Sequence, residues 1–239
     1  MTETKRLAGV IGGMGPDATV DFMAKVIAHT PAGRDQDHVR MLVDHNPHVP
    51  NRQAAILGGG DDPGPALASM AAGLEAAGAD FLVMPCNTAH VFHKAIIAAT
   101  GIPLISIIDE TVAAIGRRKP DATVVGILAT DGCLRAEIYQ QTFLDSGLSS
   151  VLPTDGELED LMGLITRIKA GDRDDDIVDG MSQLALALVD RGAQLIVAAC
   201  TEIPLVLDDN RLSVPLISST DVLARKTVAL ARCDDALPG

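Results

Sequence analysis

Short apolar runs alternate with amphipathic segments along nearly the whole chain. Near-continuous apolar runs indicate strands buried on both faces, and apolar residues at intervals of three and four indicate helices. Glycine and proline separate the two kinds of segment. The pattern therefore predicts an α/β fold in which helices flank parallel sheets. The predicted strands cover residues 7–11, 39–43, 81–85, 103–107, 123–128, 150–152, 194–198 and 214–217, and the principal predicted helices follow them, including 91–100, 109–117, 157–169 and 221–232.

The pattern restarts after the middle of the chain, which indicates an internal repeat. Gly78 to Cys86 aligns with Gly192 to Cys200, with eight residues from glycine to cysteine in both segments. Two further alignments pair 9–12 with 126–129 and 102–106 with 214–218. The sequence thus predicts two similar domains, each with a parallel sheet. The first comprises residues 1–106 plus 219–239 and the second residues 107–218, so that the last helix packs on the first half.

The amino-acid composition argues against several classes of function. The net charge of −13 argues against a nucleic-acid footprint and against binding to anionic membranes. With no Trp, one Tyr and four Phe, the chain is poorly equipped to stack on bases. Neither an export signal nor an apolar stretch of about 18 residues is evident, which predicts a cytoplasmic protein. The four cysteines form no CxxC pair, so neither a disulfide framework nor a zinc ribbon is expected.

Two of these cysteines occupy equivalent places in the repeat. Cys86 and Cys200 each follow an apolar strand, and ligands of open parallel sheets bind at the carboxyl ends of the strands. A helix starting there would lower the pKa of the thiol. One such cysteine would more often be a small buried hydrophobe. Two matched thiols facing one cleft suit racemisation, in which one thiolate removes an α-proton and the other thiol delivers a proton to the opposite face. Such a reaction needs no metal or cofactor.

Several motifs resemble the aspartate/glutamate racemase family. They are Pro-Cys-Asn-Thr-Ala-His at 85–90, Cys-Thr-Glu at 200–202 and Gly-Gly-Met-Gly-Pro at 12–16. Glu202 favours the aspartate racemase branch, because glutamate racemases usually have histidine there. The segment 46–52 is similar to that branch's loop. The resemblance implies a cofactor-independent racemase with its site between two α/β domains, an amino acid as substrate, and a homodimer. It also implies acid/base roles for Cys86 and Cys200, carboxylate binding by Arg52, Asn87, Thr88 and Thr201, substrate binding by Lys169, and a lining role for Met14.

The resemblance leaves the substrate open. It favours aspartate, with glutamate or another amino acid as the alternative. Two positions depart from the branch pattern. Asp131 in the second domain is expected to disfavour a dicarboxylate by charge repulsion, and Asp44-His45 replaces a more usual neutral polar pair.

Three other interpretations compete. The segment 13–18 fits the G-x-G-x-x-A pattern of a dinucleotide site, which would make the chain a nicotinamide-dependent oxidoreductase, but this reading leaves the paired cysteines unexplained. Cys86, His90 and His93 resemble metal ligands, but they share one helical face poorly and no second cluster completes a site, so no metal is predicted. A non-catalytic protein that binds a small anion would need the cleft and Arg52 but not two thiols.

Overall fold

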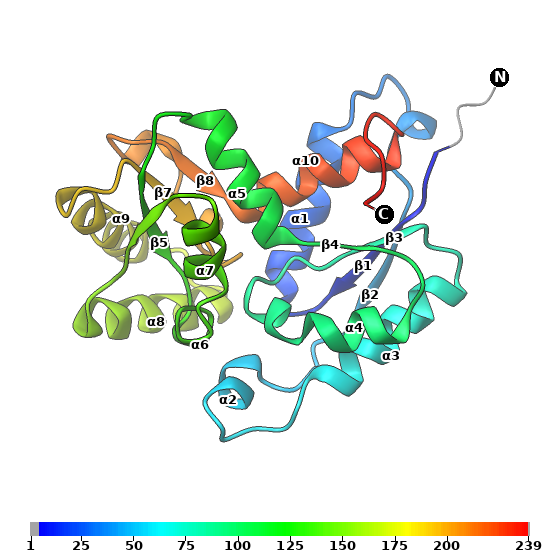
Figure 1. The fold of residues 1–239 in the computed structure, drawn as a ribbon, viewed down its shortest axis with the longest axis horizontal. Helices are drawn as coiled ribbons and strands as arrows, with labels where there is room; N and C mark the ends of the chain where they lie inside the picture. Colours follow the sequence, from blue (N-terminus) through cyan, green and yellow to red (C-terminus); the bar gives the residue numbers. More distant parts are fainter. Residues whose placement is uncertain (1–4, 239) are drawn as a thin grey trace. The chain divides into compact units, whose positions relative to one another are not determined.

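The computed structural model describes residues 5–238, which form two compact units, each with its own four-stranded sheet (Figure 1). Unit 1 contains the described residues of 1–107 and 220–239, and unit 2 contains 108–219. The chain therefore leaves unit 1 once, builds unit 2 without interruption, and returns to finish unit 1.

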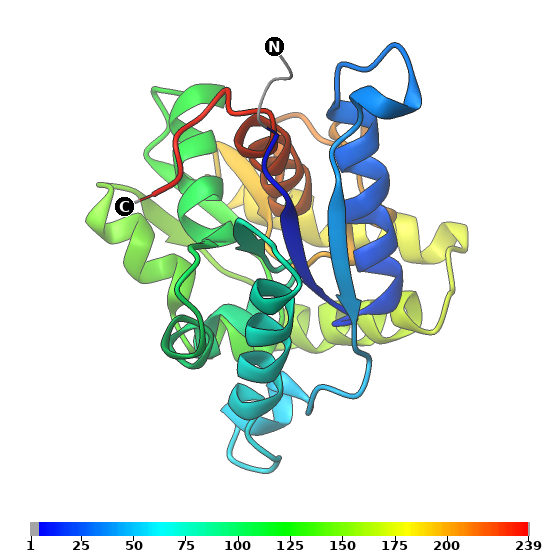
Figure 2. The same ribbon diagram turned by 90° about the vertical axis from the view of Figure 1, so that its right-hand side faces the viewer.

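The sheet of unit 1 has the order β2-β1-β3-β4, and all its pairs are parallel. Because parallel crossovers are right-handed and the chain reverses direction across the sheet after β2, helix α1 covers one face while α3 and α4 cover the other (Figures 1 and 2). The elements are β1 (Ala8–Gly12), α1 (Pro16–His29), β2 (Met41–His45), α2 (Arg52–Ile56), α3 (Gly64–Ala76), β3 (Phe81–Val83), α4 (His93–Ala99), β4 (Leu104–Ile105) and α10 (Ser219–Ala231), whose first residue belongs to unit 2.

Unit 2 repeats this topology with the order β6-β5-β7-β8, again parallel throughout. Helices α8 and α9 lie side by side, and α9 packs against β5 and β7. The elements are α5 (Ile107–Arg118), which starts at the last residue of unit 1, β5 (Val124–Leu128), α6 (Asp131–Arg135), α7 (Ile138–Asp145), β6 (Ser149–Val151), α8 (Asp155–Lys169), α9 (Asp175–Asp190), β7 (Leu195–Ala198) and β8 (Leu216–Ser218).

The central strands are almost completely buried, as the continuous apolar runs predict. Every residue of β1, β3 and β7 is buried, because helices cover both faces of each sheet. Helix α3 contributes Leu67, Met70 and Leu74 to the core of unit 1, and α9 contributes Met181 and Leu188 to that of unit 2. The predicted α/β class, with two parallel sheets flanked by helices, is confirmed.

The two units also share a close contact between equivalent residues, at Gly9 in unit 1 and Gly126 in unit 2. A Cβ added to Gly9 would lie 2.8 Å from Leu82, 2.9 Å from Ala79 and 3.3 Å from Leu74. A Cβ added to Gly126 would lie 2.5 Å from Ile196 and 3.1 Å from both Ala193 and Leu188, which are the equivalent residues. In both units, therefore, glycine lets the end of a helix pack directly on the first strand.

Several elements differ from the sequence prediction. The segment 46–52 was predicted as a loop throughout, but Arg52 begins the short helix α2. Residues 131–145, for which no helix break is evident from the sequence, form two helices, α6 and α7, because Glu137 has a left-handed backbone with φ of 53°. The segments after Cys86 and Cys200 begin with 3-10 turns at Thr88–Phe92 and Ile203–Leu205 rather than with α-helices. The spacing of hydrophobic side chains does not distinguish a 3-10 turn from the start of an α-helix.

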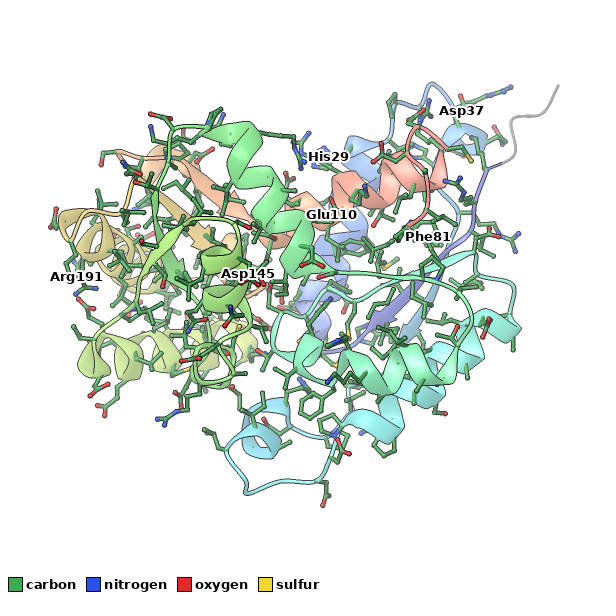
Figure 3. The ribbon with its side chains drawn as sticks, in the orientation of Figure 1. His29, Asp37, Phe81, Glu110, Asp145 and Arg191 are labelled. Carbon is green, nitrogen blue, oxygen red and sulfur yellow. The ribbon has the colours of Figure 1, made fainter. Side chains whose placement is uncertain are left out.

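The C-terminal helix α10 is fastened to unit 1 at both ends. Near its start, Asp221 Oδ1 lies 2.5 Å from His29 Nε2 at the end of α1, where Figure 3 labels His29. Near its other end, the Arg6 guanidinium donates hydrogen bonds of 2.8 Å to the carbonyls of Leu230 and Asp235. Within residues 5–238, no helix combines the length and apolarity needed to cross a membrane.

Candidate active site

Cys86 lies at the carboxyl end of the sheet of unit 1, three residues after β3. Its side chain is 7% exposed and belongs to a cluster that also contains Met14, Val49 and Ala89. These residues come from the turn after β1, the loop after β2 and the segment after β3. Parallel strands place their carboxyl ends at one edge of a sheet, and this edge gathers the predicted residues Met14 and Cys86.

His90 ties the backbone of Cys86 to the start of α5. The backbone N–H of Ile107 donates to His90 Nε2 at 3.2 Å, so Nε2 carries no proton and Nδ1 donates to the carbonyl of Cys86 at 2.9 Å. His90 is buried, and both ring nitrogens are engaged with backbone groups. The residue is therefore a structural brace for the cysteine turn.

The loop that contains Asn46 packs closely on the glycine turn after β1. Gly13 has φ of +93°, and a Cβ there would lie 2.4 Å from the backbone of Asn46. Its N–H donates to the Thr19 hydroxyl at 2.8 Å, and that hydroxyl donates to the carbonyl of Gly15 at 3.0 Å. The glycines that suggested a dinucleotide site thus have a structural explanation, which is the packing of the Asn46 loop on the turn that carries Met14.

Arg52 lies at the end of the Asn46 loop, as the first residue of α2. Its Nη1 donates to the carbonyls of Val49 and Pro50, both at 2.9 Å. The Asn51 side chain caps α2 by accepting a hydrogen bond from the N–H of Ala54. These contacts orient the guanidinium from within its own loop.

The second cysteine has different surroundings. Cys200 is 5% exposed and donates a hydrogen bond from Sγ to Glu202 Oε2 at 3.0 Å. The Thr201 hydroxyl donates to the same oxygen at 3.3 Å. Lys169, the last residue of α8, places its ammonium 2.7 Å from Glu202 Oε1. The predicted residues Cys200, Thr201 and Lys169 therefore meet at one carboxylate, that of Glu202, which sequence reasoning used only as a mark of the racemase branch.

This environment raises the pKa of the Cys200 thiol well above its usual value. Burial is the largest cause and the negative charge of Glu202 the second, while the Lys169 ammonium acts in the opposite direction. The expectation of a lowered thiol pKa is therefore wrong at Cys200. A 3-10 turn of three residues aligns few peptide dipoles, and burial beside a carboxylate outweighs their effect.

Asp131 is the residue expected to repel an acidic substrate. Its Oδ1 accepts a hydrogen bond from Arg135 Nε at 2.6 Å, one turn along α6, and its N–H donates to the sulfur of Met162 at 3.4 Å. The ion pair with Arg135 offsets the charge of the carboxylate and so weakens the reason for that expectation.

Asn87 and Thr88 follow Cys86 directly and are both buried. Asn87 precedes the 3-10 turn that Thr88 begins. In unit 1 the structure thus places Met14, Cys86, Asn87 and Thr88 at one edge of the sheet, with Arg52 on the adjoining loop. In unit 2 it places Cys200, Thr201 and Lys169 around Glu202.

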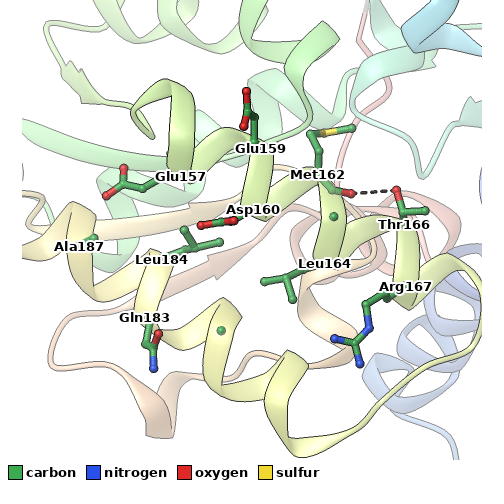
Figure 4. Close-up of a pocket in the computed structure, with 12 residues that line it drawn as sticks. Glu157, Glu159, Asp160, Met162, Leu164, Thr166, Arg167, Gln183, Leu184 and Ala187 are labelled. Carbon is green, nitrogen blue, oxygen red and sulfur yellow. Dashed lines mark hydrogen bonds between the residues drawn. The ribbon is translucent and has the colours of Figure 1, made fainter.

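A groove of about 930 Å³ lies elsewhere, between α8 and α9 (Figure 4). Its lining includes Met162, Leu164 and Leu184 together with the acidic residues Glu159 and Asp160. Its lining includes neither Cys86 nor Cys200 and none of the predicted binding residues, so the groove is distinct from the candidate site. Among residues 5–238, no group of three or more His, Cys, Asp or Glu side chains is arranged to hold a metal ion.

Comparison with known proteins identifies the family. The pattern that defines the Asp/Glu/hydantoin racemases matches residues 11–227, and the chain belongs to this family. It is 30% identical to the broad specificity amino-acid racemase RacX of Bacillus subtilis, over 93% of this chain and 97% of that protein. Its structure is similar to that of Picrophilus torridus aspartate racemase, with a TM-score of 0.86, 28% identity and coverage of 98% of this chain and 96% of that one.

The fold is shared more widely. Glutamate racemase from Francisella tularensis has a TM-score of 0.69 at 16% identity, with 98% of this chain and 84% of that chain covered. The resemblance inferred from the cysteine motifs is confirmed at the level of the family, and with it the assignment of the chain to the racemases.

Proposed function

We propose that this protein is a cofactor-independent amino-acid racemase in which Cys86 and Cys200 are the two acid/base residues, and that aspartate is its substrate. The observation that carries the proposal is the duplication. In each unit a buried cysteine follows the third strand, at the same register of the repeat. A nucleophilic enzyme needs one activated thiol, whereas inversion at a carbon needs a proton acceptor on one face and a proton donor on the other.

The reaction balances with these two groups. One cysteine thiolate removes the α-proton, and the electron pair of the broken C–H bond spreads into the α-carboxylate as an enediolate. The other cysteine thiol then donates its proton to the opposite face of the same carbon, so that the two sulfurs exchange protonation states. Asn87, Thr88 and Thr201 are proposed to donate hydrogen bonds to the carboxylate as its negative charge grows.

Arg52 is proposed to bind a substrate carboxylate, Lys169 to assist it, and Met14 to line the site. Likeness to the aspartate racemase of P. torridus supports aspartate as substrate. A wider substrate range is the second candidate, supported by the likeness to a broad specificity racemase. It is also supported by the existing partners of both cations, since Arg52 contacts two backbone carbonyls and Lys169 contacts Glu202.

The test is exchange of the α-hydrogen. The protein is incubated in D2O with aspartate, glutamate and a panel of neutral and basic amino acids, and the α-proton is followed by NMR and the enantiomer ratio by chiral chromatography. We expect loss of the α-proton signal and formation of D-aspartate. Exchange of neutral or basic amino acids in preference to aspartate would favour the second candidate, and absence of exchange across the panel would reject the racemase.

Single serine variants test the two-thiol assignment. Cys86→Ser and Cys200→Ser are each expected to lower the racemisation rate by about 100-fold or more, because a positioned acid or base contributes about that much. Cys133→Ser and Cys233→Ser serve as controls, since neither cysteine has a counterpart in the repeat. Full activity in either Cys86→Ser or Cys200→Ser would reject the assignment.

A homodimer is also proposed, on the basis of the family resemblance. Light scattering after gel filtration should then give twice the chain mass of 24.9 kDa. A monomeric mass at micromolar concentration would reject it.

A further inference from the structure

We propose that Glu202 and Lys169 are positioning residues that set the protonation of Cys200. Glu202 keeps the proton on the thiol in the free enzyme and Lys169 limits that effect, so that Cys200 begins the catalytic cycle as a proton donor that can still be deprotonated. This inference rests on the proposed racemase function. It adds an asymmetry between two thiols that occupy equivalent places in the repeat.

The geometry defines which group holds the proton. Cys200 Sγ and Glu202 Oε2 are 3.0 Å apart, and an S–H group donates to a carboxylate, whereas a thiolate at this distance would face a like charge. The second oxygen of the carboxylate meets the Lys169 ammonium at 2.7 Å. One oxygen of Glu202 therefore accepts the thiol hydrogen, and the other forms an ion pair with the Lys169 ammonium.

Burial strengthens the contact between Cys200 and Glu202, whereas the Lys169 side chain is 42% exposed. Glu202 is 3% exposed and Thr201 2% exposed, so water screens the carboxylate little on the side of Cys200. The groups that face the carboxylate are the thiol, the Thr201 hydroxyl and the ammonium. A buried carboxylate is costly without a partner of opposite charge, and Lys169 supplies that charge from the end of α8.

The two residues act on Cys200 in opposite directions. The carboxylate repels a thiolate and favours the thiol, while the ammonium favours the thiolate and limits the effect of Glu202. Lys169 therefore has a role beyond substrate binding. It keeps the proton of Cys200 removable, which the reverse direction of a racemase requires because both thiols must release and regain a proton.

The closing experiment measures the ionisation of Cys200 without using activity. The full-length protein is treated with iodoacetamide over a range of pH, and alkylation of the peptide that contains Cys200 is quantified by mass spectrometry. Glu202→Gln keeps a hydrogen-bond acceptor and removes the charge. We expect its alkylation midpoint to fall by about one pH unit or more. Lys169→Met is expected to raise the midpoint.

Variants that retain the charge distinguish an effect of charge on Cys200 from an effect on folding. Glu202→Asp and Lys169→Arg retain the charges, and their midpoints should stay nearer that of the wild type than those of Glu202→Gln and Lys169→Met. Glu157→Gln is the matched control, because it breaks another ion pair of α8, that with Arg191 at 2.7 Å, and should leave the Cys200 midpoint unchanged. Circular dichroism establishes that each variant is folded. A Glu202→Gln midpoint equal to that of the wild type would overturn the inference.

The pH profile of racemisation supplies the second readout. The alkaline limb of kcat/KM should move to lower pH in Glu202→Gln, whereas a purely structural role would lower the rate at every pH and leave the limb in place. An active racemase with an unmoved Cys200 midpoint rejects the inference alone. A protein inactive on all amino acids rejects the proposed function, even where the midpoint moves with the charge at residue 202.

Discussion

The matched cysteines show how one position in a repeat acquires two environments. Cys86 is followed by Asn87 and Thr88, and its turn is braced through the carbonyl by His90. Cys200 is followed by Thr201 and Glu202, and its sulfur itself is hydrogen-bonded to a carboxylate. The backbone framework is therefore duplicated, while the side chains that act on the thiol differ between the two units.

The His90 brace gives a first prediction. His90→Phe should lower the free energy of unfolding by about 1–3 kcal/mol, because it leaves the buried N–H of Ile107 without its acceptor and the Cys86 carbonyl without its donor. Racemisation should fall at least tenfold as the cysteine turn loosens. Urea denaturation and the exchange assay measure the two effects.

His93→Gln is the matched control for this variant. His93 Nδ1 contacts the carbonyl of His90 at 2.8 Å, and the residue is partly exposed, so water can replace this contact. Its stability should change by less than about 1 kcal/mol. A His90→Phe protein as stable and active as His93→Gln would contradict the proposed brace.

The buried thiol also predicts a pH dependence of stability. The raised pKa of Cys200 means that the native state keeps this proton at a pH where the unfolded chain releases it. Its contribution is complete below the unfolded pKa of about 8.5 and decreases as pH rises through the raised native pKa. Stability should therefore fall above about pH 9, and Cys200→Ser should show a shallower fall. An equal slope for both proteins in urea titrations would refute this.

At the scale of elements, the contact between a glycine and a helix end is the feature that both sheets share. Gly126→Ala should destabilise the protein by about 1–3 kcal/mol, because a Cβ would lie 2.5 Å from Ile196 and 3.1 Å from Leu188 within a packed core. Gly163→Ala, in the same unit, is the control. Gly163 is exposed within α8 and a Cβ there meets nothing within 4 Å, so the substitution should stabilise by about 0.5–1 kcal/mol. Thermal unfolding of both variants measures the difference, and destabilisation by Gly163→Ala alone would be inconsistent with it.

The positions of the strands could be predicted from the sequence pattern. Strands buried on both faces leave continuous apolar runs, and those runs located β1, β3, β5 and β7 within a residue or two. Gly78 and Gly192, which begin the two aligned segments of the repeat, both have positive φ values, 95° and 98°, as is typical of glycines that end helices.

Other features depend on information that hydrophobic spacing does not contain. The break between α6 and α7 follows from the left-handed conformation of Glu137, a residue type that gives no such signal. The ion pair of Glu202 involves a lysine more than thirty residues earlier in the chain, since Lys169 and Glu202 meet only in the folded unit. A usable signal was present, because Glu202 stands in an apolar segment from Leu195 to Leu205.

At the scale of the molecule, unit 2 is continuous in sequence and unit 1 is not. Residues 108–219 contain a complete four-stranded sheet and their own hydrophobic core. We therefore expect the 108–219 fragment to unfold cooperatively in urea. The 1–107 fragment lacks α10 and the partners of Arg6 and His29, and should be much less stable. A fragment 108–219 without a cooperative transition would contradict this independence.

The return of α10 to unit 1 has a consequence for synthesis on the ribosome. Translation proceeds from the N-terminus, and domains usually fold in the order in which they emerge. Here the nascent chain contains all of unit 2 before it contains residues 220–239 of unit 1. Unit 2 should therefore become protease-resistant first. Unit 1 should complete its fold only after α10 has left the exit tunnel. Until then, the face that α10 covers should be accessible to chaperones. Pulse proteolysis of stalled nascent chains would reveal this inverted order.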